Sequence, residues 1–232
     1  MNHDIVYILK NDIDDTELIY SVRSVVQNFP YNKIWFIGGV PEHIEPDEQI
    51  KYRQSGKNKW EKATNTIKKI CRNNNITEDF WLFNDDFFIM QPIEELPPLI
   101  GGTIHKRVTD IKNRHTISAY SGKLERTENL LRAKELDTLD YALHMPMLIN
   151  RKKALNTINA FPDCPMFRCL YGNYNKIGGM IVDDVKIYSQ DIEPTGDEVM
   201  LSTTNESFKN GEVGKYIREQ FPTACKYEKN ER

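Results

Sequence analysis

The sequence predicts an α/β protein built on a mainly parallel sheet. Residues 4–9 are rich in β-branched and aromatic side chains, which predicts a buried strand. Residues 17–28 carry apolar side chains at helical spacing, and residues 33–38 predict a second strand. A strand–helix–strand unit of about thirty residues places its two strands parallel. In residues 80–90, two further apolar runs favour buried strands on either side of a short polar break.

The composition fits a single folded domain. Of 232 residues, 39% are hydrophobic and 28% charged, a balance typical of globular proteins. The net charge of −3 gives no overall attraction to nucleic acid or anionic membranes, although it is compatible with a local basic patch. No apolar stretch approaches the roughly 20 residues that span a bilayer, and the N-terminus lacks the basic start of a signal peptide. We therefore expect a cytoplasmic protein without a membrane span.

The cysteines do not suggest a metal site. Cys71, Cys164, Cys169 and Cys225 form no CxxC pair, and no histidines cluster with them, so the spacing is poor for zinc. In the cytoplasm, free thiols are favoured over disulfides.

Two adjacent carboxylates, Asp85 and Asp86, form the polar break within residues 80–90. They need solvent, a basic partner or a metal ion, because a buried unpaired charge is costly. At the carboxyl end of a central strand they would lie where α/β sheets bind ligands. Magnesium is often held by one or two carboxylates plus substrate phosphates. The pair favours a metal-dependent site for a phosphorylated substrate; the alternative is a strand ending in a turn with both aspartates solvated.

The rest of the chain predicts helices separated by polar segments. Residues 41–62 predict a loop made basic by Lys51, Arg53, Lys57 and Lys59, which fits either a diphosphate-binding loop or a solvated one. Residues 101–105 predict a strand, and the strongly polar residues 106–140 predict an irregular insertion with one exposed helix. The other expected segments are helices at 63–73, 151–160 and 211–220, and an irregular stretch at 163–180.

Four short blocks occur in order along nearly the whole chain. They comprise Asp4-Ile-Val-Tyr7, then Glu17-Leu-Ile-Tyr-Ser-Val-Arg-Ser-Val25 with Asn65-Thr-Ile67 and Leu82-Phe-Asn-Asp-Asp-Phe-Phe88, then His144-Met-Pro146 with Phe161-Pro162, and lastly Phe221-Pro-Thr-Ala-Cys-Lys-Tyr-Glu228. Together they resemble the Stealth family, which is related to bacterial capsular sugar-phosphate transferases.

The resemblance implies a GT-A-like fold, a single transferase domain over residues 1–232. Residues 1–100 would bind the nucleotide sugar and residues 101–232 the acceptor. It also implies a nucleotide-sugar donor, with a UDP-sugar as the expected one, and a divalent metal, Mn²⁺ or Mg²⁺. Asn84-Asp85-Asp86 takes the place of the Asp-x-Asp element of such folds. We expect Asp86 as metal ligand with Asp85 second, and Asn84 at the nucleotide.

Further site residues each have a structural alternative. His144 fits a general base for the acceptor hydroxyl, because the ordinary pKa of histidine is about 6.5, or a metal ligand, or a hydrogen-bonded structural histidine. Asp85 joins His144 as a catalytic candidate. Asn65, Lys10 and Arg23 are candidates for donor binding; the alternatives are a helix surface for Asn65 and an ion pair for Arg23.

The chain departs from the family at one position that bears on the reaction. Stealth phosphotransferases carry an arginine downstream of the His-Met-Pro histidine, and where that pattern places it this chain has Tyr174; Arg168 and Lys176 are the nearest cations. Asp183 and Asp184 form a second carboxylate pair, which fits either a base or two solvated side chains. Loss of the arginine weakens the case for phosphotransfer but leaves nucleotide-sugar binding intact.

The leading hypothesis is therefore a metal-dependent glycosyltransferase that moves a sugar from a nucleotide donor to a hydroxyl. The acceptor would be a glycan, a modified nucleic-acid base or a protein. One alternative is a hexose-1-phosphate transferase using the same donor, and the other is a non-catalytic module that binds sugar nucleotides or glycans.

Overall fold

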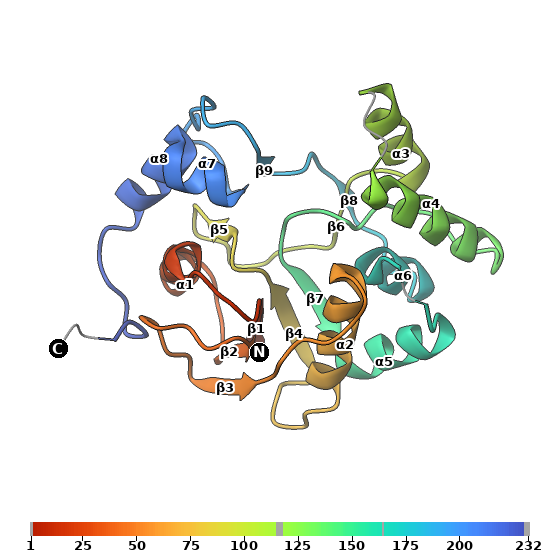
Figure 1. The fold of residues 1–232 in the computed structure, drawn as a ribbon, viewed down its shortest axis with the longest axis horizontal. Helices are drawn as coiled ribbons and strands as arrows, with labels where there is room; N and C mark the ends of the chain where they lie inside the picture. The colour runs from red at the N-terminus through yellow and green to blue at the C-terminus, as the bar shows by residue number, and fades with distance from the viewer. Residues whose placement is uncertain (1, 115–117, 164, 230–232) are drawn as a thin grey trace.

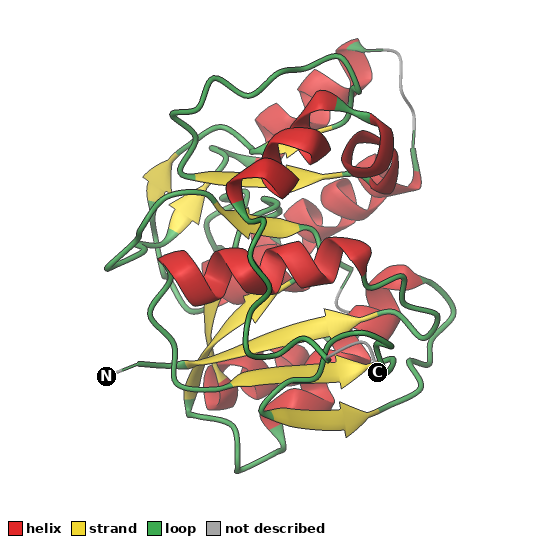
Figure 2. Ribbon diagram, turned by 90° about the vertical axis from the view of Figure 1, so that its left-hand side faces the viewer, coloured by secondary structure: helices red, strands yellow, loops and turns green. Residues whose placement is uncertain are grey.

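The structure, a computed structural model, describes residues 2–114, 118–163 and 165–229 and contains a five-stranded mixed sheet (Figure 1). Its strands, in the order β3-β2-β1-β4-β7, are Glu48–Lys51, Ile34–Gly38, Asp4–Leu9, Asp79–Phe83 and Met147–Asn150. The first four are parallel, and β7 is antiparallel to β4. Figure 2 shows three strands of the sheet with their arrowheads on the same side. The predicted α/β class is confirmed, and the parallel arrangement holds for four strands of this sheet.

The described residues form eight helices, which cover both faces of the main sheet and extend beyond one edge (Figure 1). They are α1 (Thr16–Asn28), α2 (Lys59–Cys71), α3 (Ile104–Asn113), α4 (Ala119–Arg132), α5 (Arg151–Ala160), α6 (Phe167–Tyr174), α7 (Asn205–Asn210) and α8 (Glu212–Gln220). The predicted helix at 151–160 is confirmed, and the helices predicted at 17–28 and 211–220 match α1 and α8 to within a residue at their starts.

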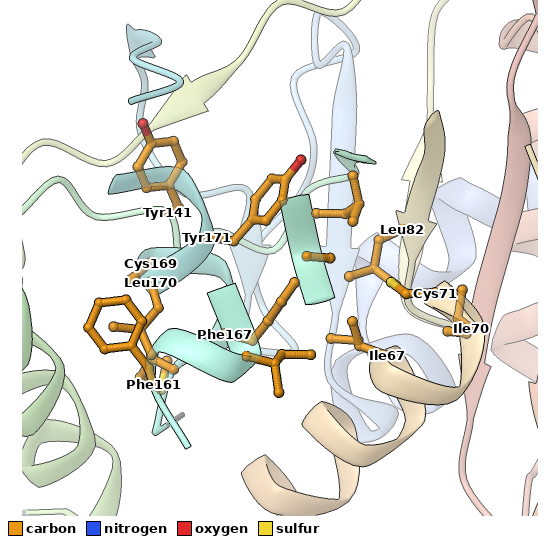
Figure 3. Packing of buried hydrophobic residues seen from close by; sticks show 14 of the residues in the cluster. Ile67, Ile70, Cys71, Leu82, Tyr141, Phe161, Phe167, Cys169, Leu170 and Tyr171 are labelled. Atoms are coloured by element: carbon orange, nitrogen blue, oxygen red, sulfur yellow. The ribbon is translucent and has the colours of Figure 1, made fainter. Parts of the chain in front are cut away.

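Alternating side chains of the central strands pack into two separate hydrophobic cores, one on each face of the sheet. In β1, Val6 packs into the core under α2, α5 and α6, whereas Tyr7 packs into the core under α1. In β4, Leu82 and Phe83 divide in the same way, since successive side chains of a strand face opposite sides of the sheet. Figure 3 shows the first of these cores, where Leu82 lies opposite side chains of α2 and α6.

Two small sheets pair strands that follow β4 with strands from the last third of the chain. The first, in the order β5-β10-β9, contains Phe87–Ile89, Met200–Thr203 and Lys186–Ile187. The second pairs β6 (Leu99–Ile100) with β8 (Met180–Ile181) in parallel. Because β5 starts directly after Asp86, its pairing with β10, and that of β10 with β9, brings Ser202 and Lys186 close to the two aspartates.

The polar segment after the central strand is helical, which corrects two predictions. The strand predicted at 101–105 is wrong, because Thr103 accepts a hydrogen bond from the backbone N–H of Lys106 and caps the start of α3. The irregular insertion predicted over 106–140 is wrong in part: α4 overlaps the one helix predicted there, at 124–136, but α3 is a second helix that was not predicted. Ser118 and Ser121 form a capping box at the start of α4.

The irregular stretch predicted at 163–180 contains α6, so that prediction is wrong as well. Gly172 allows this helix to pack, because a Cβ there would lie 2.3 Å from the ring of Tyr141. Of the cysteines predicted as free thiols, Cys71, Cys169 and Cys225 are confirmed, and Cys164 lies outside the described residues. Among the helices that the structure describes, none has the length and hydropathy needed to cross a bilayer.

Candidate active site

The candidate site lies at the carboxyl ends of β1 and β4, where the strand order reverses. The chain proceeds from β1 to β2 and β3 on one side, then crosses to β4 on the other side of β1. Such a switch point leaves a crevice in which α/β sheets bind ligands. Lys10 follows β1, and Asn84, Asp85 and Asp86 follow β4, so the predicted strand-end position of the aspartates is correct.

Glycines allow the backbone to close tightly beside this crevice. Gly38, at the end of β2, has a φ of +129°, and an added Cβ would lie 2.1 Å from the carbonyl oxygen of Leu9. A Cβ on Gly39 would lie equally close to the carbonyl oxygen of Lys10. No larger residue fits at either position without a backbone shift, so these glycines help to fix the start of the loop that carries Lys10.

Asp86 forms a buried ion pair with Lys186, one hundred residues along the chain. The Lys186 Nζ lies 2.5 Å from Asp86 Oδ2, and the two side chains are only 9% and 18% exposed. Lys186 also donates to the carbonyl oxygen of Thr203. The other carboxylate oxygen of Asp86, Oδ1, is buried and has no hydrogen-bond partner. Asp86 therefore keeps one oxygen available to a further cation.

Asp85 and Glu17 add negative charge next to this pair. Burial raises the pKa of Asp85, an effect that Lys10 opposes and Asp86 reinforces. Burial also raises the pKa of Glu17 to about 7, while a hydrogen bond donated by Thr203 Oγ1 at 2.8 Å opposes the shift. The charges of Asp85 and Asp86 raise the pKa of Glu17 further, and Lys186 lowers it. The cluster holds more carboxylates than lysines, which favours an added cation.

His144 is held by Asp184 at two points. Asp184 Oδ1 accepts a hydrogen bond from the backbone N–H of His144, and Oδ2 lies 2.9 Å from His144 Nδ1. Arg107 donates to the same Oδ2 at 2.9 Å. Although burial opposes the charge, the hydrogen bonds from His144 and Arg107 hold the pKa of Asp184 well below its ordinary value. An ionised carboxylate can only accept, so Nδ1 carries the proton and Nε2 is the basic nitrogen of the neutral ring.

Arg168 fixes the backbone on both sides of His144. Its Nη1 donates to the carbonyl oxygens of Leu143 and Met145, at 3.0 and 2.5 Å. Its guanidinium lies over the ring of Phe87, and its buried Nη2 has no hydrogen-bond partner. Burial lowers the pKa of Arg168 to about 10, while the charges of Asp86 and Asp184 oppose that shift. Arg168 thus stays cationic at neutral pH and lies within the electrostatic reach of both aspartates.

A cavity of about 870 Å³ lies beside part of this cluster, although Asp85, Asp86 and Arg168 are not among its lining residues. His144, Asp184, Arg107 and Lys186 line it, so it reaches from the His144–Asp184 pair to the cation beside Asp86. The further charged and aromatic lining residues are Lys59, Lys106, Asp110, Arg114, Tyr120, Asp183 and Tyr188. Most of these charges are positive, which suits an anionic ligand next to the aspartates.

The carboxylates fit a divalent metal only with help from a ligand. Among the described residues, no group of three or more His, Cys, Asp or Glu side chains stands ready to hold a metal ion. The buried free oxygen of Asp86 and the neighbouring Asp85 supply two hard oxygen donors. Magnesium is commonly bound in this way, by one or two carboxylates with substrate phosphates completing the shell. The residues present therefore fit Mg²⁺ or Mn²⁺ bound together with a diphosphate.

The other predicted site residues divide into those near the aspartates and those elsewhere. Asn84 is half-buried next to Asp85, and Lys10 acts on Asp85 electrostatically. Asn65 lies on α2, where its Nδ2 donates to the carbonyl oxygen of Ser55 at 3.0 Å. Arg23 donates to Glu228 through Nε and Nη2 at 2.8 and 2.6 Å, which is the ion-pair alternative considered for it. Because Arg23 is engaged with Glu228, it is not part of the candidate site.

Sequence reasoning missed three residues of this site: Glu17, Lys186 and Arg107. Glu17 lies in the first turn of α1, inside a block used only for the family resemblance. Lys186 contacts Asp86, which is 100 residues away in sequence, and Arg107 contacts Asp184, which is 77 residues away. Of the second carboxylate pair, Asp184 is half-buried against His144 and Asp183 is exposed. The sequence signal available for Lys186 was its position two residues after Asp184.

In comparisons with known protein families and with curated protein sequences, no family model and no curated sequence matched this chain.

Proposed function

We propose that the chain is a metal-dependent glycosyltransferase of GT-A type, which moves a sugar from a nucleotide donor to an acceptor hydroxyl. The observation that carries the proposal is the position of Asp85 and Asp86 at the switch point between β1 and β4, with one carboxylate oxygen of Asp86 left unpaired. Nucleotides bind at this place in open α/β sheets. The cavity of about 870 Å³ beside it has the volume of a typical small-molecule site.

Asp86, with Asp85 second, would hold the metal ion. When bound, Mg²⁺ or Mn²⁺ would neutralise the charge that builds on the leaving diphosphate. Lys186 pairs with Asp86 Oδ2 and lines the cavity, so its ammonium would supply positive charge to the phosphates of a bound donor. Lys10 lies across the crevice and adds positive charge on the β1 side.

His144 would take the proton from the acceptor hydroxyl. Its side chain is 30% exposed and lines the cavity, and the contact of Nδ1 with Asp184 leaves Nε2 as the nitrogen that would accept the proton. The arrangement follows the general logic of a base oriented by a third group. Arg107 keeps Asp184 ionised and Arg168 holds the flanking backbone, so both act as positioning residues.

Sugar-phosphate transfer is the second candidate, and one observation favours it. Arg168 is cationic, carries a buried Nη2 without a partner, and interacts electrostatically with Asp86. An extra cation beside the β-phosphorus would stabilise the charge that develops there during phosphotransfer. The two reactions release different products, namely a nucleoside diphosphate for glycosyl transfer and a monophosphate for phosphotransfer.

A thermal-shift screen tests donor binding. Unfolding of the wild type is followed with a panel of sugar nucleotides, each with and without Mn²⁺ or Mg²⁺, because ligands that bind only the native state raise Tm. We expect one donor to raise Tm in the presence of metal, and Asp86→Asn to abolish that increase. Asp163→Asn is the control, since Asp163 is 69% exposed in a surface pair with Arg126. An equal shift in Asp86→Asn, or no shift with any donor, would contradict the proposal.

A further inference from the structure

Positive charge is concentrated in residues 51–72, which we name the basic segment. Its 22 residues hold eight lysines and arginines and one acidic residue, Glu61, although the whole chain has a net charge of −3. The eight cations are Lys51, Arg53, Lys57, Lys59, Lys62, Lys68, Lys69 and Arg72. Such a local excess in an acidic chain creates a positive field at one part of the surface.

The cations of the basic segment are not neutralised by the protein. Within the part of the chain that the structure describes, none of the eight forms an ion pair, whereas Lys106 of α3, Arg126 of α4 and Arg151 of α5 each do. Six of the eight are exposed and the other two are half-buried. Uncompensated like charges repel one another, so the segment carries an electrostatic cost that a polyanion would relieve.

The loop and the helix of the basic segment share one surface. Asn65 of α2 donates to the carbonyl oxygen of Ser55 at 3.0 Å, and Lys69 Nζ lies 5.3 Å from the ring centre of Tyr52. These contacts hold the loop along the helix. Together they form a hollow of about 640 Å³ with no acidic residue in its lining, which comprises Ile50, Tyr52, Asn65, Lys68, Lys69, Arg72 and Asn73.

The other end of the basic segment opens into the candidate active site. Lys59, the first residue of α2, lines the cavity that contains His144. Next to it, the ring of Trp60 lies between two ammonium groups, Lys59 Nζ at 4.9 Å and Lys123 Nζ of α4 at 5.6 Å. The cations thus run from the hollow at Tyr52 to the mouth of the cavity, with an aromatic ring near each end.

We propose that the basic segment binds a nucleic acid and presents it to the cavity as the acceptor. The binding stands on the charge distribution alone, while the role as acceptor rests on the proposed function. A helix of 13 residues is about 20 Å long, which matches about six phosphates of one strand at roughly 3.4 Å each. A nucleotide donor engages far fewer cations than the eight present. Trp60 and Tyr52 provide the aromatic surfaces on which bases stack in single-strand sites.

Fluorescence anisotropy with a labelled 20-nucleotide DNA, single-stranded and as a duplex, tests the binding. The test variant is Arg53→Glu/Lys69→Glu/Arg72→Glu, which reverses three exposed charges outside the cavity. The control is Lys134→Glu/Lys152→Glu/Lys215→Glu, which makes the same charge change on exposed residues elsewhere. At about 0.1 M salt we expect the test variant to bind at least tenfold more weakly than the wild type and the control. We also expect its salt slope to fall by about 0.7 per lost contact for the single strand and about 0.9 for the duplex.

Two results would overturn the inference: equal weakening in the control variant, or binding of a sulfated polysaccharide with no binding of either DNA form. The second result would identify a surface for acidic glycans. The assay contains no donor, no metal and no turnover, so its outcome is independent of the proposed transferase chemistry. In the converse direction, the test variant should keep the wild-type Tm increase with donor and metal, because its three substitutions lie outside the cavity.

Discussion

Asp184 holds His144 through both its backbone and its ring, with Oδ1 and Oδ2 each 2.9 Å from a nitrogen of that residue. This double contact fixes the position of the loop and the orientation of the imidazole at once. Arg107 keeps the carboxylate charged, so a tilt of the ring would break a charge-assisted hydrogen bond. The imidazole of His144 is therefore held in one orientation, as its proposed role as a base requires.

Replacing Asp184 by Asn should disable His144 while leaving donor binding intact. The amide cannot supply the charge that His144 and Arg107 share, and it permits the wrong tautomer of the ring. We expect transfer to fall by about 10²–10⁴-fold, the range of general acid–base contributions. The measurement is kcat for transfer together with the donor-induced Tm increase. Asp163→Asn should retain wild-type turnover; loss of donor binding in Asp184→Asn would contradict a role in positioning the base.

Removing Lys186 should destabilise the metal-free protein and enlarge the increase in Tm that a metal ion causes. Lys186→Met leaves Asp86 buried next to Asp85 and Glu17 without its cation, and breaking a largely buried pair costs about 3 kcal/mol. The comparison variant is Lys209→Met, because Lys209 and Asp14 form a pair whose side chains are about half exposed, and solvent-exposed pairs contribute little to stability. Tm is measured with and without Mn²⁺. A metal-induced increase in Lys186→Met no larger than in the wild type would contradict the site assignment.

Glu17 should make the protein less stable as pH rises from about 4.5 to about 7. Its folded pKa is raised to about 7 from an ordinary 4.5, so the folded state binds the extra proton in this window. The stabilisation that Glu17 contributes is complete below its pKa in the unfolded state, and it is lost as pH rises through its pKa in the folded state. The loss is on the order of 3 kcal/mol. Urea unfolding at pH 4 and pH 8 measures it.

Glu17→Gln provides the comparison, because Gln keeps an oxygen for the hydrogen bond from Thr203 but cannot ionise. The difference in unfolding free energy between the two proteins should change in favour of Glu17→Gln as pH rises. Taking this difference cancels the pH dependence that other carboxyls contribute to both proteins. One of them is Asp14, whose pKa is lowered to about 2 by its hydrogen bonds with Lys209 and Thr16. A difference independent of pH would show that Glu17 titrates normally.

Arg168→Met should reduce both stability and turnover. The substitution keeps an apolar stem over Phe87 but leaves the carbonyl groups of Leu143 and Met145 without their donor. We expect the free energy of unfolding to fall by about 2–6 kcal/mol, because two acceptors lose their donor and each unsatisfied buried acceptor costs about 1–3 kcal/mol. Arg218→Met is the control: Arg218 also lies over a phenylalanine ring and donates to a carbonyl, but in α8. Reduced kcat per folded molecule in Arg168→Met alone separates positioning from stability.

The sequence predicts the parts of the fold that depend on local patterns. The strand at residues 4–9 and the helix at 151–160 follow from hydrophobic periodicity, and Asp85 and Asp86 stand out because charges interrupt an apolar run. Hydrophobic periodicity does not predict helix α6, because its Tyr-Gly-Asn-Tyr sequence becomes helical through packing of Gly172 against Tyr141. Tertiary contacts override weak local propensity at such places.

The partners of the site residues were beyond prediction for a related reason. Asp86 and Lys186 meet only because β5 pairs with β10 and β10 with β9, and Glu17 meets Thr203 through the same small sheet. Strands of two or three residues leave almost no periodic signal. The residues that bear charge could be read from the sequence, but which of them share a site required the topology.

Analysis of the nucleotide released from a UDP-sugar in the presence of Mn²⁺ tests the central claim most directly. The assay covers a panel of UDP-sugars and compares the wild type with Asp86→Asn and the Asp163→Asn control, each with and without a chelator. We expect UDP as the product of the wild type and the control, and its loss in Asp86→Asn and after chelation. Release of UMP, or UDP release that persists in Asp86→Asn, would contradict metal-dependent glycosyl transfer at this site.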